Sequence, residues 1–277
     1  MTQQVERMLP LYEGKMGWQY DHRAATFIGV GDTDTVPNLD HSAPARVHPR
    51  YWVREEVVRD RLDRRTWGTD SALLGFRRVA RNTDERTVIA SMIPWGAASY
   101  GWILSAGPNA RDLALLLAQY NSFAFDYVLR QFLSQPSVPQ GTFSQLPILP
   151  PTAFAELDAT VGDGAEWVIR RVALLAGAGE EMTSLARALG LDDAAPWSED
   201  LRRSCRAELD AAMFHLFGIR REDLEYVMDS FNIIKRKDLA VHGTYRTKDL
   251  ILSIYDEIHA ALVAGTEYRS SFEQEQS

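Results

Sequence analysis

The chain has 277 residues, 45% hydrophobic and 25% charged, which is the balance of an ordinary globular protein with enough length for a substantial core. No apolar run approaches the ~18 residues of a membrane span, and the polar start MTQQVERM is not typical of a signal peptide, so we expect a cytoplasmic protein without a membrane partner. The single cysteine, Cys205, excludes an internal disulfide and suits a reducing compartment.

The net charge of −8 is unusual for a protein that binds nucleic acid, but the charge is unevenly distributed. Residues 1–150 hold 16 Lys and Arg against 15 Asp and Glu, whereas the remaining residues hold 14 against 23. Residues 46–86 contain 11 arginines, no lysine and 7 acids. This pattern allows one basic face, but from composition alone solvated surface arginines are the preferred interpretation.

Residues 1–45 are predicted to form an N-terminal arm followed by a flexible loop rich in Gly, Asp, Pro and Ser. The segment Leu11–Arg23 mixes aromatic and basic side chains, a composition suited to stacking on bases and binding phosphates. Trp18 and Tyr20 equally suit a hydrophobic core. The sequence Glu13-Gly14-Lys15 matches half of a metal-dependent nuclease site, but the further carboxylate that such a site needs is not evident, so we predict no metal site.

Residues 46–151 are predicted to form a small mixed α/β module. A helix is expected over 51–65, strands over 73–80 and 86–94 with a hairpin turn between them, and a third strand over 100–104. Apolar residues at helical spacing then predict one long helix from Ala110 to about Gln135, where Pro136 ends it. A loop framed by prolines follows, and we expect it to face a large partner.

Residues 152–277 are predicted to be mainly helical, which makes the whole chain α+β. Helices are expected over 166–176, 180–189 and 201–217, and a last one from Thr247 to Gly265. We expect Cys205 in the core, Asp210 on the polar side of its helix and a frayed C-terminus. A basic cluster before the last helix favours phosphate contact, with a solvated turn as the alternative; it comprises Lys235, Arg236, Lys237, His242, Arg246 and Lys248.

Three segments carry a family resemblance. The first is PLYEGKMGWQYDHRAAT at Pro10–Thr26, and the second is NSFAFDYVLR followed by GTFSQLPILPP within Asn121–Pro151. The third, Arg206–Ile258, contains RAELDAAMFHLFGI followed by FNIIKRKDLAVHGTYRTKDLILSIYDEI. In this order they closely resemble the specificity region of large N6-adenine DNA methyltransferases. These are the type IIG restriction-modification enzymes and the related methyltransferases of phage-defence systems such as BREX and DISARM. The resemblance covers nearly the whole chain.

The catalytic motifs of that family are not found in this sequence. Adenine methylation needs a glycine-containing loop for S-adenosylmethionine and an Asn/Asp-Pro-Pro-Tyr/Phe tetrapeptide that holds the flipped base. Pro150-Pro151 lies between Leu149 and Thr152 and does not match the tetrapeptide. We therefore expect no cofactor in this chain and no methylation by it alone. The resemblance implies that a catalytic domain N-terminal to Met1, or a separate subunit, supplies S-adenosylmethionine.

The sequence thus predicts the DNA-binding target-recognition part of an adenine-specific methyltransferase system, with double-stranded DNA and a catalytic domain or subunit as partners. The alternatives are a protein-interaction subunit of a defence complex without DNA contact, a nuclease and a degenerate gene product. The predicted DNA contacts are Lys15, Arg23, Arg50, Arg54, Arg64, Arg65, Arg77, Arg78, Arg81, Arg86, Thr142, Arg246 and Lys248.

Overall fold

The computed structural model of the chain describes residues 6–27, 38–41, 46–63, 65–67, 69 and 71–270. Arg64 lies outside the described residues. The fold is α+β, as predicted, with two small three-stranded sheets and a larger body of helices. None of the helices in the described part of the chain combines the length and the apolar character that a membrane crossing requires.

The first sheet is built on the N-terminal segment. Strand β1 (Met8–Tyr12) pairs antiparallel with β2 (Trp52–Arg54) and parallel with β5 (Ala97–Ala98). The predicted arm is therefore partly a central strand, and the helix expected over 51–65 is shortened to α1 (Glu55–Leu62). Because the backbone before α1 pairs with β1, those residues are extended rather than helical.

The second sheet contains the predicted hairpin. Strand β3 (Ala72–Arg77) lies between β4 (Ala90–Pro94) and β6 (Trp102–Ser105), and both pairings are antiparallel. The strand predicted from Arg86 begins only at Ala90, because the amides of Thr87 and Val88 donate to the Asp126 carboxylate instead of to a strand.

The helix predicted from Ala110 to Gln135 is interrupted. Helices α2 (Ala110–Asn121) and α3 (Phe123–Phe132) are separated by Ser122, whose backbone is extended at φ −70° and ψ 150°. The Ser122 hydroxyl accepts a hydrogen bond from the Phe125 amide at 3.2 Å and so caps α3. The start of α2 follows the sequence, since the Asn109 side chain accepts from the Asp112 amide at 2.8 Å.

The helices expected over 166–176 and 201–217 and from Thr247 are confirmed, and Gly218 and Gly265 follow α8 and α11 at φ +66° and +62°. The segment expected over 180–189 divides into a 3₁₀ turn and a shorter helix. Two helices between Arg221 and His242 were not predicted. The bounds are α4 (Gln140–Phe143), α5 (Asp158–Val161), α6 (Gly164–Ala176), α7 (Thr183–Ala188), α8 (Glu199–Leu216), α9 (Arg221–Asp229), α10 (Asn232–His242) and α11 (Arg246–Ala264), with 3₁₀ turns at Gly14–Met16, Pro151–Leu157 and Glu180–Met182.

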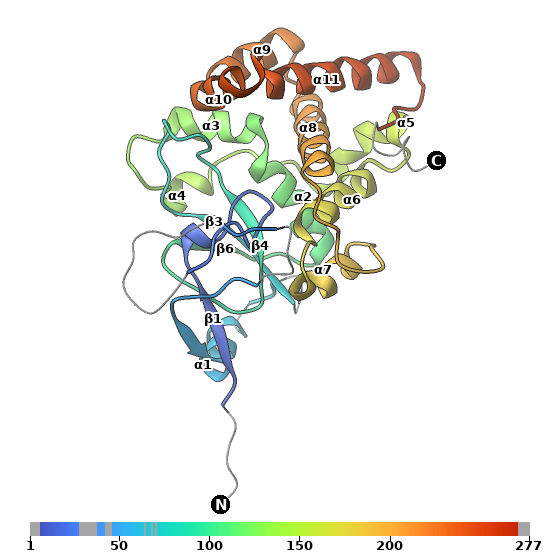
Figure 1. Cartoon of the computed structure of the whole chain (residues 1–277). Coiled ribbons are helices and arrows are strands. Elements are labelled where there is room, and N and C mark those ends of the chain that lie inside the picture. Colours follow the sequence, from blue (N-terminus) through green and yellow to red (C-terminus); the bar gives the residue numbers. More distant parts are fainter. Residues whose placement is uncertain are drawn as a thin grey trace, which may run out of the picture.

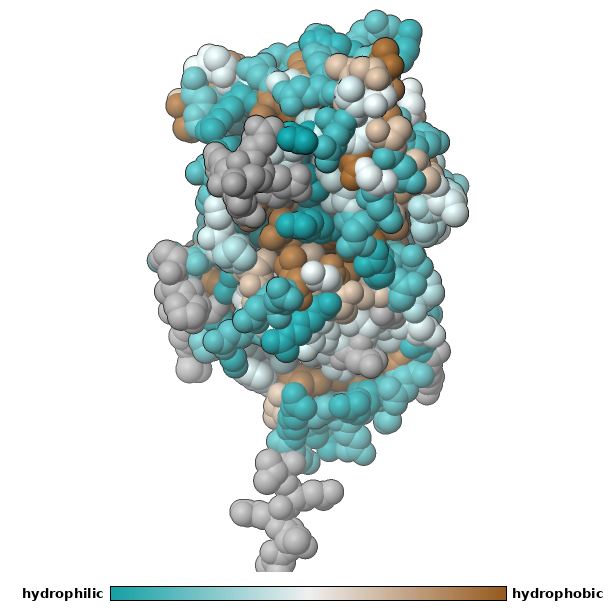
Figure 2. All heavy atoms as spheres, turned by 90° about the vertical axis from the view of Figure 1, so that its right-hand side faces the viewer, coloured by the Kyte–Doolittle hydropathy of each residue, from teal (hydrophilic) through white to brown (hydrophobic). Residues whose placement is uncertain are grey.

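Figure 1 shows β1 and α1 at one end of the molecule and α9, α10 and α11 at the opposite end. A large hydrophobic core extends from β3 and β4 through α2, α3, α6 and α8 to α11, and a smaller core lies under β1 and α1. The division predicted at residue 151 is one of composition, and packing is continuous across it. On the face in Figure 2, hydrophobic residues lie in small groups among hydrophilic ones, as is usual for a globular protein.

The described part of the C-terminal segment docks onto the helices instead of fraying. Its Tyr268 is 7% exposed, and the phenol donates to Glu208 Oε1 at 3.0 Å. The Tyr268 amide also donates to the Thr160 carbonyl at 2.8 Å. Glu208 additionally binds the buried Arg171 guanidinium, so the tail completes a buried polar cluster between α6 and α8.

Candidate nucleic-acid interface

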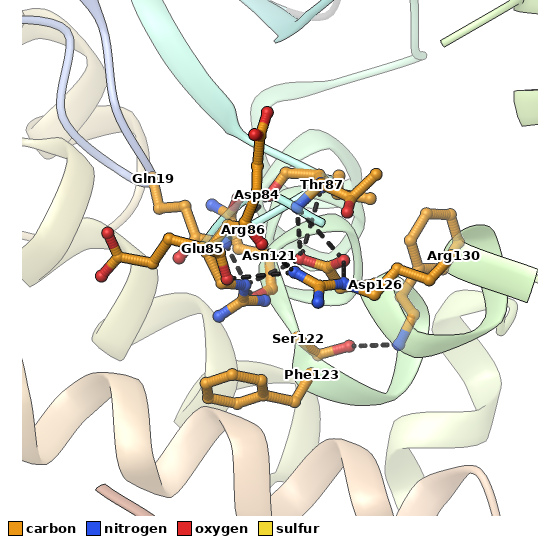
Figure 3. A network of polar contacts seen from close by, with 12 residues as sticks. Gln19, Asp84, Glu85, Arg86, Thr87, Asn121, Ser122, Phe123, Asp126 and Arg130 are labelled. Carbon is orange, nitrogen blue, oxygen red and sulfur yellow. Dashed lines mark hydrogen bonds and ion pairs between the residues drawn. The ribbon is translucent and has the colours of Figure 1, made fainter. Parts of the chain in front are cut away.

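The segment from Asn121 to Arg130 forms a buried polar network. Asp126 is fully buried and accepts from Arg86 Nε at 2.8 Å and from Arg130 Nε at 3.0 Å. Its oxygens also accept from the backbone amides of Thr87 and Val88 at 3.0 and 3.3 Å. Figure 3 shows Asp126 between the two arginines. The carboxylate thus pairs with two guanidinium groups inside the fold and offsets one of their two charges.

Asn121 is the second structural residue of this network. Its side chain accepts from the Ala90 amide and donates to the Ala90 carbonyl, both at 3.0 Å, and so imitates a strand partner at the end of β4. Its own carbonyl accepts from Gln19 Nε2 at 3.2 Å and from Arg86 Nη2 at 2.5 Å. The polar residues of this motif therefore hold elements together. Their hydrogen bonds also satisfy buried donors and acceptors, whose burial without a partner would destabilise the fold.

The proline-framed loop is fixed against α2 and the second sheet. The Phe143 ring stacks on Phe76 with centroids 3.8 Å apart. Gln119 accepts from the Leu149 amide at 2.6 Å and donates to the Leu149 carbonyl at 3.2 Å. Ile148 is 57% exposed, so only part of this loop faces outward.

A tight turn in the N-terminal segment approaches the same network. The Trp18 amide donates to the Asp21 carbonyl at 2.7 Å, and the Asp21 amide donates back to Trp18 at 3.0 Å. Tyr20 has φ +59°, a left-handed conformation that is rare for a residue with a bulky side chain. The turn is held in place because the Tyr20 amide donates to Ala90 at 3.0 Å and Gln19 Nε2 donates to Val88 at 3.0 Å.

Beside this turn lies a cleft composed of two adjoining hollows of about 230 and 550 Å³, which share Trp18, Gln19, Glu85 and Arg206. The cleft brings together residues of the N-terminal turn, β3, α8 and α10. Cations outnumber carboxylates around it, seven to four, although the whole chain is acidic. The cations are Lys15, Arg77, Arg86, Arg202, Arg203, Arg206 and Lys237, and the carboxylates are Asp21, Glu85, Glu199 and Asp210.

Several of these cations already have partners in the protein. Lys237 Nζ lies 2.6 Å from Glu85 Oε2, and Arg203 pairs with Asp200. Arg202 donates to the Leu175 carbonyl at 2.5 Å, and burial lowers its pKa to about 10. Arg202 therefore keeps its positive charge at neutral pH, and all three cations already have a partner within the chain.

Arg77 is held beneath the turn. Its guanidinium donates to the Gly17 carbonyl and lies over the Trp18 ring at 5.1 Å from the centroid. Burial lowers the pKa of Arg77 to about 10, so it also stays charged at neutral pH. Arg77 therefore contributes positive potential to the cleft and orients Trp18 at its border.

Arg206 differs from these cations. It is half-buried and lines both hollows, and it makes no hydrogen bond or ion pair with any residue that the structure describes. Burial lowers its pKa, while the charges of Glu199 and Asp210 oppose that shift. A guanidinium carries five N–H donors, so Arg206 can bind an external acceptor without breaking an existing contact.

Asp210 was expected on the polar side of its helix, but it is buried, with 6% exposure, next to Arg206 in the smaller hollow. It accepts from the Phe123 amide at 2.8 Å. Burial raises the pKa of Asp210 to about 7, although nearby Arg86 and Arg206 oppose the shift. The carboxyl is thus protonated in a large fraction of molecules at neutral pH and only partly offsets the surrounding cations.

The structure brings three of the predicted DNA contacts together at the cleft: Lys15, Arg77 and Arg86. The prediction needs correction for Arg86, which is 5% exposed and bound to Asp126, and for Arg23, which is 6% exposed. Arg23 lies 5.8 Å from the centroid of the Trp197 ring, beside the larger hollow. Little of either side chain is open to solvent, and the burial of Arg86 follows from its contact with Asp126, which lies 40 residues away in the sequence.

The other described candidates do not line the cleft. Arg54 precedes α1 and Arg246 begins α11, so these two exposed residues lie at opposite ends of the molecule (Figure 1). Arg65 and Arg81 are exposed, and Thr142 is half-buried on α4. Four have side-chain partners within the chain: Arg50 lies over Phe27 at 4.5 Å, Arg78 lies over Tyr100 at 4.0 Å, Arg54 Nη1 lies 3.9 Å from Glu6 Oε1, and Lys248 Nζ lies 2.9 Å from Asp229.

Sequence reasoning missed Arg202, Arg203 and Arg206 as candidates. Arg206 follows Arg203 by three residues and Arg202 by four on α8, and this spacing is a recognisable signal for a basic helical face. The acidic composition of the C-terminal half hid it. No three histidine, cysteine or carboxylate side chains cluster as metal ligands among the described residues. Comparisons with protein-family models, curated proteins and solved structures found no match to the chain.

Proposed function

We propose that this chain binds DNA as the target-recognition part of an adenine-specific methyltransferase of a restriction-modification or phage-defence system. A catalytic domain that these 277 residues do not contain brings S-adenosylmethionine. The observation that carries the proposal is the cleft, where seven cations face four carboxylates in a chain of net charge −8. A local excess of this kind attracts a polyanion even when the whole protein repels it.

In the proposed complex, the DNA backbone passes the cleft between the N-terminal turn and α8. Arg206 supplies donors to a phosphate, and Lys15 and Arg203 add to the attraction. Exposed arginines outside the cleft, such as Arg81, extend the contact along the duplex. Sequence readout belongs to side chains near the backbone contacts, and the target adenine is turned out toward the catalytic domain.

The proposal is tested by fluorescence anisotropy of the purified chain with a labelled duplex over a series of salt concentrations. The double variant Arg203→Gln/Arg206→Gln should weaken binding and reduce the slope of log K against log salt by about 2, which is about one for each lost phosphate contact. The matched control is Arg220→Gln/Arg221→Gln on α9, which removes the same charge from exposed arginines paired with acids outside the cleft. Equal slopes for the two double variants, or binding that does not depend on salt, would contradict the proposal.

A second candidate function, docking of a partner protein, is favoured by exposed apolar residues on the C-terminal helices. Tyr226 on α9, Val241 on α10 and Val263 on α11 are 69%, 74% and 76% exposed. In this case the acidic helical half binds another subunit and makes no DNA contact. The same salt series separates the two candidates, because a chain that only docks a partner protein would show no detectable affinity for the duplex.

A further inference from the structure

We infer that the smaller hollow of the cleft is a binding site for a single nucleotide, with its phosphate on Arg206 and its base against Trp18 and Ile234. The nucleotide is either free in solution or one unit turned out of a DNA strand. This inference deepens the proposed function. It rests on the proposed function only if the nucleotide is a unit turned out of a DNA strand. It identifies a site on this chain itself, separate from the pocket of a catalytic domain.

The argument begins with the anion. Arg206 has no hydrogen-bond acceptor among the described residues, although it is half-buried and lines the hollow. Arg203 lines the same hollow, and its pairing with Asp200 is an exposed contact that exchanges readily. A phosphate oxygen matches the planar donors of a guanidinium better than any uncharged acceptor.

Part of the lining of the hollow is apolar and suits a flat, uncharged group. Ile234 of α10 and Leu250 and Ile251 of α11 line it, and Trp18 borders both hollows. The arrangement combines donors for an anion, an aromatic ring and aliphatic side chains. A base attached to a phosphate presents the complementary set, because every base has a π-face that stacks on aromatic side chains.

Polar groups on the buried side of the hollow suit the edge of a base. Asp210 lines the hollow and is a proton donor or acceptor near neutral pH, because burial raises its pKa to about 7. Asn121 and Gln19 also line the hollow, but their side-chain amides already have partners. The Asn121 amide binds the backbone of Ala90, and the Gln19 amide donates to the carbonyls of Val88 and Asn121. Asp210 is therefore the group that we assign to the base edge, where it can bind either a ring nitrogen or an amino group.

The size of the cleft agrees with this ligand. The smaller hollow measures about 230 Å³ and adjoins one of about 550 Å³. Together they reach the ~300–1,000 Å³ range typical of small-molecule sites. A base occupies the smaller hollow, and the sugar leads to the phosphate, which binds Arg206 where the two hollows meet. The strained Tyr20 backbone lies at the same place, as expected where a turn is held in position for binding.

The inference is tested by isothermal titration calorimetry of the whole chain with 5′-deoxynucleotides, with the matching nucleosides and with inorganic phosphate. Nucleotides should bind more tightly than either fragment, since each fragment lacks half of the contacts. Arg206→Gln should weaken nucleotide binding at least about tenfold, and the control Arg220→Gln should leave it unchanged. Ile234→Phe fills the hollow and keeps every cation, so it should weaken nucleotide binding but not phosphate binding.

The inference is overturned if both cleft variants bind nucleotides like the unaltered chain, or if nucleotides bind no more tightly than inorganic phosphate. If Arg206→Gln lowers the melting temperature, Ile234→Phe carries the test, because it changes no charge. A duplex with one unpaired nucleotide identifies the source. If the chain binds this duplex more tightly than a fully paired one, and Ile234→Phe abolishes the difference, the ligand is a nucleotide turned out of a strand. If the chain binds both duplexes equally, the ligand is a free nucleotide. If the chain binds nucleotides but shows no salt-dependent binding of a duplex, the proposed function is refuted and the nucleotide site stands. If it binds a duplex but no nucleotide, the nucleotide site is refuted and the proposed function stands.

Discussion

Asp126 holds the centre of the fold together, and its conversion to asparagine is the sharpest test of the buried network. The carboxylate is fully buried between Arg86 and Arg130, whose side chains are 6% and 9% exposed. Asp126→Asn keeps the shape but removes the charge and turns one acceptor into a donor that faces a guanidinium. Loss of one partner of a buried ion pair costs ~3–5 kcal/mol, and here two cations and two backbone amides depend on it. We expect a loss of about 4 kcal/mol in the free energy of unfolding, a large part of the ~5–15 kcal/mol typical of a domain.

Urea denaturation followed by circular dichroism measures this loss, and hydrogen exchange locates it. The amides of Thr87 and Val88 should lose protection first, because they donate to Asp126. The control is Asp223→Asn, which removes one carboxylate from an exposed pair with Arg220 and should leave the unfolding free energy unchanged within error. If Asp126→Asn destabilises the protein no more than the control does, the network is not a source of stability and the account of this motif is wrong.

Three further predictions follow from particular contacts. Burial raises the pKa of Asp210 from 3.8 to about 7, so the folded state binds a proton more tightly than the unfolded chain. The stability that this proton contributes is lost as the pH rises from 3.8 to about 7. Asp210→Asn does not titrate, so its melting temperature relative to that of the unaltered chain should rise over this pH range and stay constant above it. Phe143→Ala removes the ring stacked on Phe76 and should cost ~3–5 kcal/mol in urea denaturation, whereas Phe143→Leu should cost less. Tyr268→Phe removes the hydrogen bond to Glu208 and should cost about 1 kcal/mol, with faster amide exchange at residue 268.

Local chemistry made a large part of the fold predictable from sequence. The helix start near Ala110, the left-handed cap at Gly218 and the helix stop at Gly265 were predicted from these local residue types, and the structure confirms them. Contacts between distant segments decided the rest. Ser122 breaks the long helix, and Asp126 captures amides that the pattern assigned to a strand. Apolar periodicity is unaffected by either event, so it could not indicate them.

The candidate site was predictable only in part for the same reason. The mixture of aromatic and basic residues pointed to the segment that contains Lys15 and Trp18, and both line the cleft. Which arginines stay accessible depends on carboxylates and carbonyls far away in the sequence. Arg86 meets Asp126, 40 residues later, whereas Arg206 meets no acceptor among the described residues. Charge counting along the chain treats these two residues alike, and only the packing separates them.

The polar residues of Asn121–Arg130 hold the fold together, whereas the groups that we assign to ligand binding lie in other segments, and Arg86 contacts both sets. Asn121 and Asp126 are buried and bind other parts of the chain, so these two polar side chains support the framework of the fold. Arg86 binds both residues and also lines the smaller hollow, next to Asp210. The network therefore holds one side of the hollow in place, and sequence preference has to come from the residues at its opening. Substitutions in the motif should weaken every ligand together with stability, whereas substitutions at Arg206 or Ile234 should change binding in a folded protein.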